Sequence, residues 1–247
     1  TDDDVAGFTI VELEGSTEVD ESGTTDTFTV VLDAQPTSDV VISLSSNDGS
    51  EISIPSSLSF TSANWDTAQT VTVTGVDDSI IDGTITSTIT VAVDDANSDD
   101  DFDAVANQTV SVDTTDDDAA GFTIVELEGS TEVDESGTTD TFTVVLDAQP
   151  ASDVVISLAS DDTGEATVTS TLSFTAANWD TPQTVTVTGA DDTAIDSTQT
   201  STITISIIDA ISDNSFDAVA DKTVSVDTTD DDVAGFTITE LDGATEV

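Results

Sequence analysis

Acidic side chains carry most of the chemistry that is open to this chain. Its 247 residues include 53 Asp or Glu, one Lys, and no His or Cys. Without His or Cys there is no Cys–His or Ser–His–Asp arrangement for nucleophilic catalysis. Glu12, Glu14 and Glu18 could supply a carboxylate pair for glycoside hydrolysis, but nothing else in the sequence supports that chemistry. We therefore expect no enzymatic activity, and the acids point instead to cation binding.

The acids gather in clusters that occur twice along the chain. Carboxylates a few ångströms apart repel by about 1–4 kcal/mol per pair, and Lys222 is the one basic residue that could relieve this. The clusters are Asp20-Glu21, Asp48 with Glu51, Asp77-Asp78 with Asp82, Asp99–Asp103 and Asp116-Asp117-Asp118, and they recur as Asp134-Glu135, Asp161-Asp162 with Glu165, Asp191-Asp192 with Asp196, Asp213 with Asp217, and Asp230-Asp231-Asp232.

A hard divalent cation would neutralise such clusters. Calcium accepts about six to eight oxygen ligands in flexible geometry, whereas magnesium keeps its waters and demands octahedral order. Zinc and copper prefer His or Cys, which this chain lacks. We therefore predict calcium sites at the clusters, several ions per repeat, including one at the junction between repeats.

Asp is also a good turn former, so some clusters can equally be solvated turns. That interpretation is preferred for Asp33, Asp66 and Asp147. Calcium is preferred for the runs at 77–78 and 116–118, which recur as contiguous runs in the second copy. Both interpretations stay open for Asp99–Asp103, since the second copy keeps only Asp213 and Asp217 of that group.

The sequence contains two nearly identical copies of one segment. Thr1–Leu44 and Thr115–Leu158 differ at only two positions, Val5/Ala119 and Thr37/Ala151, at an offset of 114 residues. A fixed period of this size indicates a tandem array of whole domains. The expected organisation is the end of a preceding repeat at 1–4, repeats at 5–118 and 119–232, and the start of a third repeat at 233–247. We expect the natural protein to continue on both sides.

Alternation of apolar and polar residues predicts short strands, and abundant Thr and Val favour them. No helical period of any length is present, so the predicted fold is an all-β sandwich of immunoglobulin-like shape, repeated end to end. Trp65 and Trp179 are expected to plug the edge of each sandwich. The first copy has strands predicted at 8–10, 27–32, 40–44, 57–60, 69–74, 86–93 and 109–112.

Charge and hydropathy exclude several classes of partner. With one Lys and a net charge of −52, the chain lacks the basic side chains needed to bind nucleic acid phosphates or an anionic membrane surface. No run of 18 apolar residues is present, so we expect no membrane insertion. An acidic chain can also be disordered, but the apolar fraction of 36% and the regular alternation favour folded domains.

The order and spacing of several short segments suggest a family. They are Glu21-Ser22-Gly23, Ser57-Leu58-Ser59-Phe60-Thr61, Gln69-Thr70-Val71-Thr72-Val73, Asp77-Asp78-Ser79-Ile80-Ile81-Asp82 and Asp116-Asp117-Asp118. Together they resemble the Calx-β family, named for the calcium-binding domains of sodium–calcium exchangers. The resemblance implies calcium ligands at one end of each sandwich, namely Glu21, Asp48, Asp77, Asp78, Asp82, Asp116, Asp117 and Asp118, with Glu135, Asp162, Asp191, Asp192, Asp196, Asp230, Asp231 and Asp232 in the second copy. Asp99, Asp103, Asp213 and Asp217 are additional candidates.

The chain departs from the exchanger version of that family. It lacks a Gly-x-Asp-Tyr loop and has no Tyr at all. The segment Ala63-Asn64-Trp65-Asp66, with Gln69, is closer to variants in very long bacterial adhesins of the RTX type, secreted by type I systems. The resemblance therefore implies an extracellular, cell-surface setting.

The expected function is mechanical. Calcium would turn the repeats into a monomeric rod, with the neighbouring repeats as its partners, that holds a distal adhesion domain away from the cell during biofilm formation. The alternatives are a module that binds glycans or surfaces, and a calcium sensor that regulates an attached domain.

Overall fold

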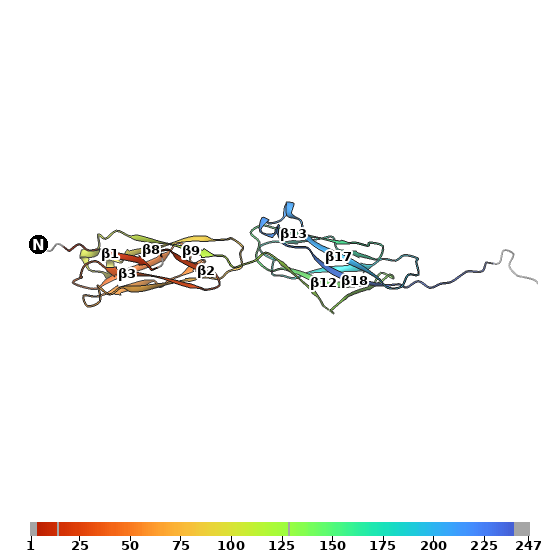
Figure 1. Ribbon diagram of the computed structural model, residues 1–247, viewed down its shortest axis with the longest axis horizontal. Coiled ribbons are helices and arrows are strands. Elements are labelled where there is room, and N and C mark those ends of the chain that lie inside the picture. The colour runs from red at the N-terminus through yellow and green to blue at the C-terminus, as the bar shows by residue number, and fades with distance from the viewer. Residues whose placement is uncertain (1–3, 14, 128, 240–247) are drawn as a thin grey trace, which may run out of the picture. The chain divides into compact units, whose positions relative to one another are not determined.

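The computed structural model describes residues 4–13, 15–127 and 129–239. The chain divides into two compact units, Thr1–Asp118 and Ala119–Val247, and each contains an immunoglobulin-like β-sandwich (Figure 1). The repeat ends expected at 1–3 and 240–247, and Glu14, lie outside the described residues. Among the described residues, no helix has the length and apolar character needed to cross a membrane.

The two units contain the same succession of elements. Unit 1 contains β1 (Phe8–Glu12), β2 (Thr17–Asp20), β3 (Thr25–Leu32), β4 (Val40–Ser46), β5 (Ile52–Ser53), β6 (Ser57–Phe60), β7 (Gln69–Gly75), β8 (Ile85–Val93), η1 (Asp95–Asn97), η2 (Asp100–Phe102) and β9 (Gln108–Thr115). Unit 2 contains β10 (Phe122–Glu126), β11 (Thr131–Asp134), β12 (Thr139–Leu146), β13 (Val154–Ser160), β14 (Ala166–Val168), β15 (Thr171–Phe174), β16 (Gln183–Gly189), β17 (Gln199–Ile207), η3 (Asp209–Ile211), η4 (Asn214–Phe216) and β18 (Lys222–Thr229).

Each sandwich is built from a four-stranded and a five-stranded sheet. In unit 1 the strand orders are β1-β3-β7-β5 and β2-β9-β8-β4-β6, and unit 2 repeats them as β10-β12-β16-β14 and β11-β18-β17-β13-β15. All pairs are antiparallel except β2 with β9 and β11 with β18. This arrangement confirms the predicted all-β sandwich fold.

The core follows from the alternation in the sequence. In β9, for example, Val110 and Val112 are buried while Thr109 and Ser111 are not. Burial of one such apolar side chain contributes about 1.5–3 kcal/mol. Trp65 packs against this core, as predicted.

Two strands of the first unit escaped the sequence prediction. β2 carries acids on its outward positions, which lowers its strand propensity, although Thr17 and Val19 face inward and are buried. β5 has only two residues, too few for an alternation to be visible. The short 3-10 helices η1 to η4 have three residues each and were also not predicted.

The strand pairing brings several chain ends to one end of each unit. β2 and β9 run parallel, and their last residues, Asp20 and Thr115, are partners. β3 begins at Thr25, directly after the turn that follows β2, and Thr25 pairs with Thr74 near the end of β7. The loops after β2, β7 and β9 therefore meet at the same end. We call this the acidic end; in unit 1 it comprises the segments 21–24, 47–51, 76–84 and 116–118.

Gly75 allows β7 to approach the turn after β2 closely. A Cβ atom at Gly75 would lie 2.0 Å from the carbonyl oxygen of Asp20, and one at Gly189 would lie 2.1 Å from that of Asp134. The amide of Gly75 donates to the carbonyl of Thr24 at 3.0 Å. No larger residue fits at this position without moving the backbone that carries the acidic end.

Gly75→Ala should therefore destabilise unit 1 by about 1–3 kcal/mol, the usual cost of overpacking. Urea unfolding followed by tryptophan fluorescence would measure the change, because each unit has one Trp. Gly49→Ala is the matched control, since a Cβ atom there meets nothing within 4 Å. Equal stability of the two variants would contradict this account of Gly75.

Candidate metal centre

Glu21 is held inside the acidic end by its own backbone. Its amide donates to the carbonyl of Thr115 at 3.0 Å, and the amide of Gly23 closes the turn on the carbonyl of Asp20 at 3.1 Å. Gly23 has a φ of 91°, a conformation that favours glycine. The side chain of Glu21 is only 1% exposed, so the turn directs a carboxylate into the interior.

Asp116 joins the loop after β7 to the segment after β9. Its Oδ2 accepts the amides of Asp82 at 3.0 Å and Gly83 at 2.9 Å. Its Oδ1 accepts the amide of Asp118 at 2.8 Å. A single carboxylate thus fixes the backbone of two segments that carry acidic residues, and unit 2 repeats these three bonds through Asp230.

Glu51 reaches the same place from the loop after β4. Asn47 anchors that loop on β8, because its Oδ1 accepts the amide of Thr88 at 2.7 Å and its amide donates to the Thr88 carbonyl at 3.1 Å. The carbonyl of Glu51 also accepts the amide of Val76 at 2.9 Å. The Glu51 side chain is 5% exposed.

These loops bring the carboxylates into overlapping groups. One oxygen each from Glu21, Asp78 and Asp118 lie within 4.8 Å of one another, and the same holds for Glu21, Glu51 and Asp82. Glu21 belongs to both groups. In unit 2 the groups are Glu135, Asp192 and Asp232, and Glu165, Asp192 and Asp196. We call each pair of groups the carboxylate cluster of its unit.

Some predicted ligands lie around the clusters and belong to none of these groups. Asp77 and Asp117 are exposed. Burial raises the pKa of Asp118, and the charges of these two acids add to that effect. Asp191 and Asp231 act on the pKa of Asp232 in the same way. Asp116 and Asp230 hold the backbone of neighbouring loops through the hydrogen bonds described above.

In the loop after β4, the carboxylate groups include Glu51 and do not include Asp48. Asp48 Oδ1 accepts the amide and the hydroxyl of Ser50, at 3.1 and 2.5 Å, while Glu51 reaches the cluster. In unit 2, Asp162 Oδ1 accepts the amide of Gly164 at 2.9 Å, and Glu165 joins the cluster. The sequence held a signal for these two Glu residues: the loop differs between the copies, yet both keep Glu at this position.

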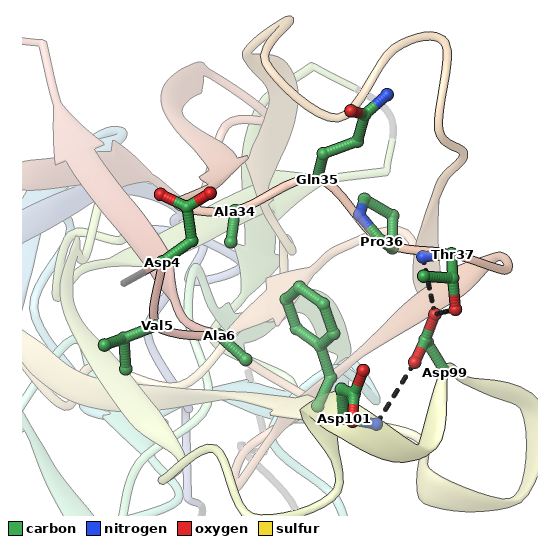
Figure 2. Close-up of a pocket in the computed structure, with 10 residues that line it drawn as sticks. Asp4, Val5, Ala6, Ala34, Gln35, Pro36, Thr37, Asp99 and Asp101 are labelled. Atoms are coloured by element: carbon green, nitrogen blue, oxygen red, sulfur yellow. Dashed lines mark hydrogen bonds between the residues drawn. The ribbon is translucent and has the colours of Figure 1, made fainter. Parts of the chain in front are cut away.

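Asp99 lies at the opposite end of unit 1, where β3 ends and β9 begins. Figure 2 shows its carboxylate between the backbone of Thr37 and that of Asp101. Oδ2 accepts from Thr37 N, Thr37 Oγ1 and Ser38 N at 2.7–2.8 Å, and Oδ1 accepts from Asp101 N at 3.1 Å. These bonds, led by that from Ser38, hold the pKa of Asp99 well below its usual range.

The remaining candidates are Asp103 in unit 1, and Asp213 and Asp217 in unit 2. Asp213 accepts the amide and hydroxyl of Ser152, at 2.7 and 3.2 Å, and the amide of Ser215 at 3.0 Å. Asp103 and Asp217 are exposed. The structure therefore does not bring Asp99, Asp103, Asp213 or Asp217 into the carboxylate clusters.

The clusters hold buried carboxylate oxygens that lack any hydrogen-bond partner. In unit 1 these are Glu21 Oε2, Glu51 Oε2 and Asp118 Oδ2. Burial raises the pKa of Glu21 to about 7, and the charges of Asp78 and Asp82 add to this effect. Burial likewise raises the pKa of Glu135 to about 7. Because an unpaired buried charge is costly, the cluster favours either a bound proton or a bound cation.

The donor set fits a hard metal ion. It consists of carboxylate oxygens, and the chain has no His or Cys for a softer metal. No basic side chain can serve instead, since the single Lys, Lys222, donates to the carbonyl of Phe122 at the start of β10. The acidic clusters can therefore hold metal ions.

Comparison with known proteins finds similarity only among solved structures. No protein-family model and no curated protein matches this chain. CBD12 from CALX1.2 is 15% identical, with a TM-score of 0.34, over 81% of this chain and 79% of that one. The apo-form Calx CBD1 domain is 15% identical, with a TM-score of 0.35, over 47% of this chain and all of that one.

Domains 4 and 5 of the S-layer protein SbsC are 18% identical to this chain, with a TM-score of 0.35, over 76% of each chain. At such identities and TM-scores, none of these similarities bears on what this chain binds.

The raised pKa values give calcium-free protein a distinctive pH dependence. The pKa of Glu21 rises from 4.5 to about 7 on folding, so the folded chain binds more protons than the unfolded chain between these values. Its contribution to stability is complete below the unfolded pKa and is lost as the pH rises through 7. Melting temperatures in chelator should therefore fall between pH 5 and about pH 8.

Glu21→Gln together with Glu135→Gln should flatten this profile, because Gln mimics the protonated acid at every pH. Asp99 and the other acids of lowered pKa act in the opposite direction, but only at lower pH, below their ordinary value of 3.8. A wild-type melting temperature that rises across this window would refute the assignment of buried acids to the cluster.

Proposed function

We propose that this chain is a calcium-stiffened spacer from a bacterial cell-surface adhesin. In this proposal calcium fills the carboxylate cluster of each repeat and restrains the segment that leads into the next repeat. The array then acts as a monomeric, non-enzymatic rod that holds a distal binding domain away from the cell for adhesion and biofilm formation. The setting is extracellular, and the partners of each repeat are its neighbours in the same chain.

The observation that carries the proposal is the set of buried carboxylate oxygens without partners in both units. Two overlapping groups that share Glu21 fit two adjacent cations bridged by one carboxylate. Calcium suits them better than magnesium, because carboxylates, carbonyls and water can complete a flexible shell of about six to eight oxygens.

The ligand positions explain why calcium would act on the connection between repeats. Asp118 is in the cluster of unit 1 and is also the last residue of that unit, so Ala119 of unit 2 follows directly. No flexible Gly- or Ser-rich linker separates the repeats. Binding of an ion through Asp118 would fix the backbone at the start of the connection.

An extracellular site needs only modest affinity. Calcium modules outside the cell bind with dissociation constants of about 10⁻⁴–10⁻³ M. The near-identity of the two copies supports a spacer, since a spacer depends on length more than on the surface of any one repeat. The single basic residue and the absence of Cys are compatible with this setting.

Calcium should raise the melting temperature of the chain strongly, because a bound cation would neutralise the carboxylates that repel one another in each cluster. For one site, a ligand at about a hundred times its Kd stabilises the folded state by about 2.7 kcal/mol. Differential scanning calorimetry in calcium and in chelator would measure the shift. Glu21→Gln with Glu135→Gln should raise stability in chelator and reduce the calcium effect.

Asp66→Asn with Asp180→Asn is the control, because it removes the same number of charges from exposed turns. It should leave the calcium effect intact. If calcium changes the melting temperature of neither the wild type nor the control, the calcium proposal fails.

The acid run at 116–118 tests the mechanical part of the proposal. Replacement of Asp116, Asp117 and Asp118 by Asn should let the two units hinge freely in calcium, because the connection loses its ligands and its backbone clamp. Small-angle X-ray scattering should then report a shorter maximum dimension and a broader distribution of interatomic distances than for the wild type.

The same replacement at 230–232 is the control. It removes the equivalent ligands of unit 2 but leaves the connection at residues 118 and 119 unchanged. Scattering from this control should match the wild type in calcium. Identical scattering from both variants would sink the idea that calcium restrains the connection.

A further inference from the structure

The buried polar atoms without partners are not only carboxylates. In the described part of the chain, all such side-chain oxygens belong to five positions of the repeat. Three positions are the cluster acids at 21, 51 and 118 and their copies at 135, 165 and 232. The other two are hydroxyl positions: Ser87 with its copy Ser201, and Thr114.

These hydroxyls occupy core positions next to the acidic end. Thr114 is the last inward residue of β9, after Val110 and Val112, and is fully buried. Ser87 is the first buried residue of β8, before Ile89 and Val91, and is also fully buried. Both strands therefore change from apolar to hydroxyl side chains where they approach the carboxylates.

The backbone beside each hydroxyl holds a ligand-bearing loop. Thr115, next to Thr114, accepts the amide of Glu21, and Thr88, next to Ser87, anchors the loop that leads to Glu51. In unit 2 the connection is direct, because Thr228 Oγ1 donates to the carbonyl of Glu165 at 3.3 Å. The hydroxyls thus lie on strands whose neighbouring residues hold the loops of the carboxylate cluster.

A hydroxyl with no acceptor is unfavourable in a core. Val has almost the shape of Thr and would fill the position of Thr114 without this penalty, as it does at Val110 and Val112. Both units nevertheless keep a hydroxyl at both positions. Apart from these hydroxyls, the buried side-chain oxygens without a hydrogen-bond partner in the described residues are all carboxylate oxygens of the clusters, which lack donors.

We propose that Ser87 and Thr114, with Ser201 and Thr228, are positioning residues of the metal centre. When a cation draws the carboxylates into ligating orientations, these hydroxyls donate to them, directly or through one water molecule. Outer partners of this kind fix the orientation of a ligand and raise the affinity for the metal. The inference rests on the proposed cation binding and adds buried hydroxyl groups that orient the carboxylates.

The test uses the full chain with Thr114→Val and Thr228→Val together. Calcium affinity, measured by isothermal titration calorimetry, should fall about tenfold or more, as for other outer-shell substitutions. The melting temperature of the single variant Thr114→Val in chelator should stay the same or rise, because its hydroxyl has no acceptor, whereas that of Thr228 donates to the Glu165 carbonyl. Thr114→Ser with Thr228→Ser keeps the hydroxyls and should keep the affinity.

Thr17→Val with Thr131→Val is the matched control. These Thr residues are also buried, but they donate to Glu12 at 3.1 Å and Glu126 at 2.9 Å, outside the cluster. This control should lower the melting temperature in chelator and leave calcium affinity unchanged. Ser87→Ala with Ser201→Ala should behave like the Thr114 variant.

Two results would overturn the inference while leaving calcium binding intact. One is wild-type affinity in both the Thr114 and the Ser87 double variants. The other is a Thr114→Val single variant as unstable in chelator as Thr17→Val alone, which would make the Thr114 hydroxyl an ordinary structural donor. A wild-type chain that binds no calcium would instead overturn the proposed function, and this inference with it.

Discussion

The structure depends on one constraint, the burial of like charges without a basic partner at one end of each sandwich. Glu21 and Glu135 are almost fully buried, and the only Lys of the chain lies at the start of β18, bonded to Phe122. Backbone hydrogen bonds hold the loops that carry these acids, but they do not neutralise the charge. Stability therefore depends on what is added, either protons at low pH or a cation at neutral pH.

Two kinds of acid perform different tasks in this design. Asp99 and Asp116 accept backbone amides with both oxygens, so they act as clamps that shape loops. Glu21 and Glu51 each have a buried oxygen with no donor, so they remain available for a ligand. What separates the two classes is the number of nearby donors and not the type of side chain, since both are carboxylates.

The sequence predicted the fold, and it located the loops that carry the carboxylate cluster. Alternation located most strands, because one face of each strand is buried, whereas β5 is too short to alternate. The repeat also placed Glu51 in an acidic cluster with Asp48, but only Asp48 was named among the expected ligands. Which carboxylate in a loop points inward depends on local turns, such as the Asp48–Ser50 bonds that keep Asp48 outside.

The position of the carboxylate cluster along the chain is what would allow a bound cation to act on the connection between the units, as we propose. Asp116 and Asp118 follow the last strand of unit 1, and the next residue begins unit 2. Any ion held through Asp118 therefore reduces the backbone freedom of the connecting segment, whatever orientation the units adopt. Since conformational entropy is the main cost of ordering a chain, a spacer that must stay extended benefits from ligands placed at this point. The proposed role of the buried hydroxyls would serve the same end, because ligands that are already oriented lose less entropy when an ion binds.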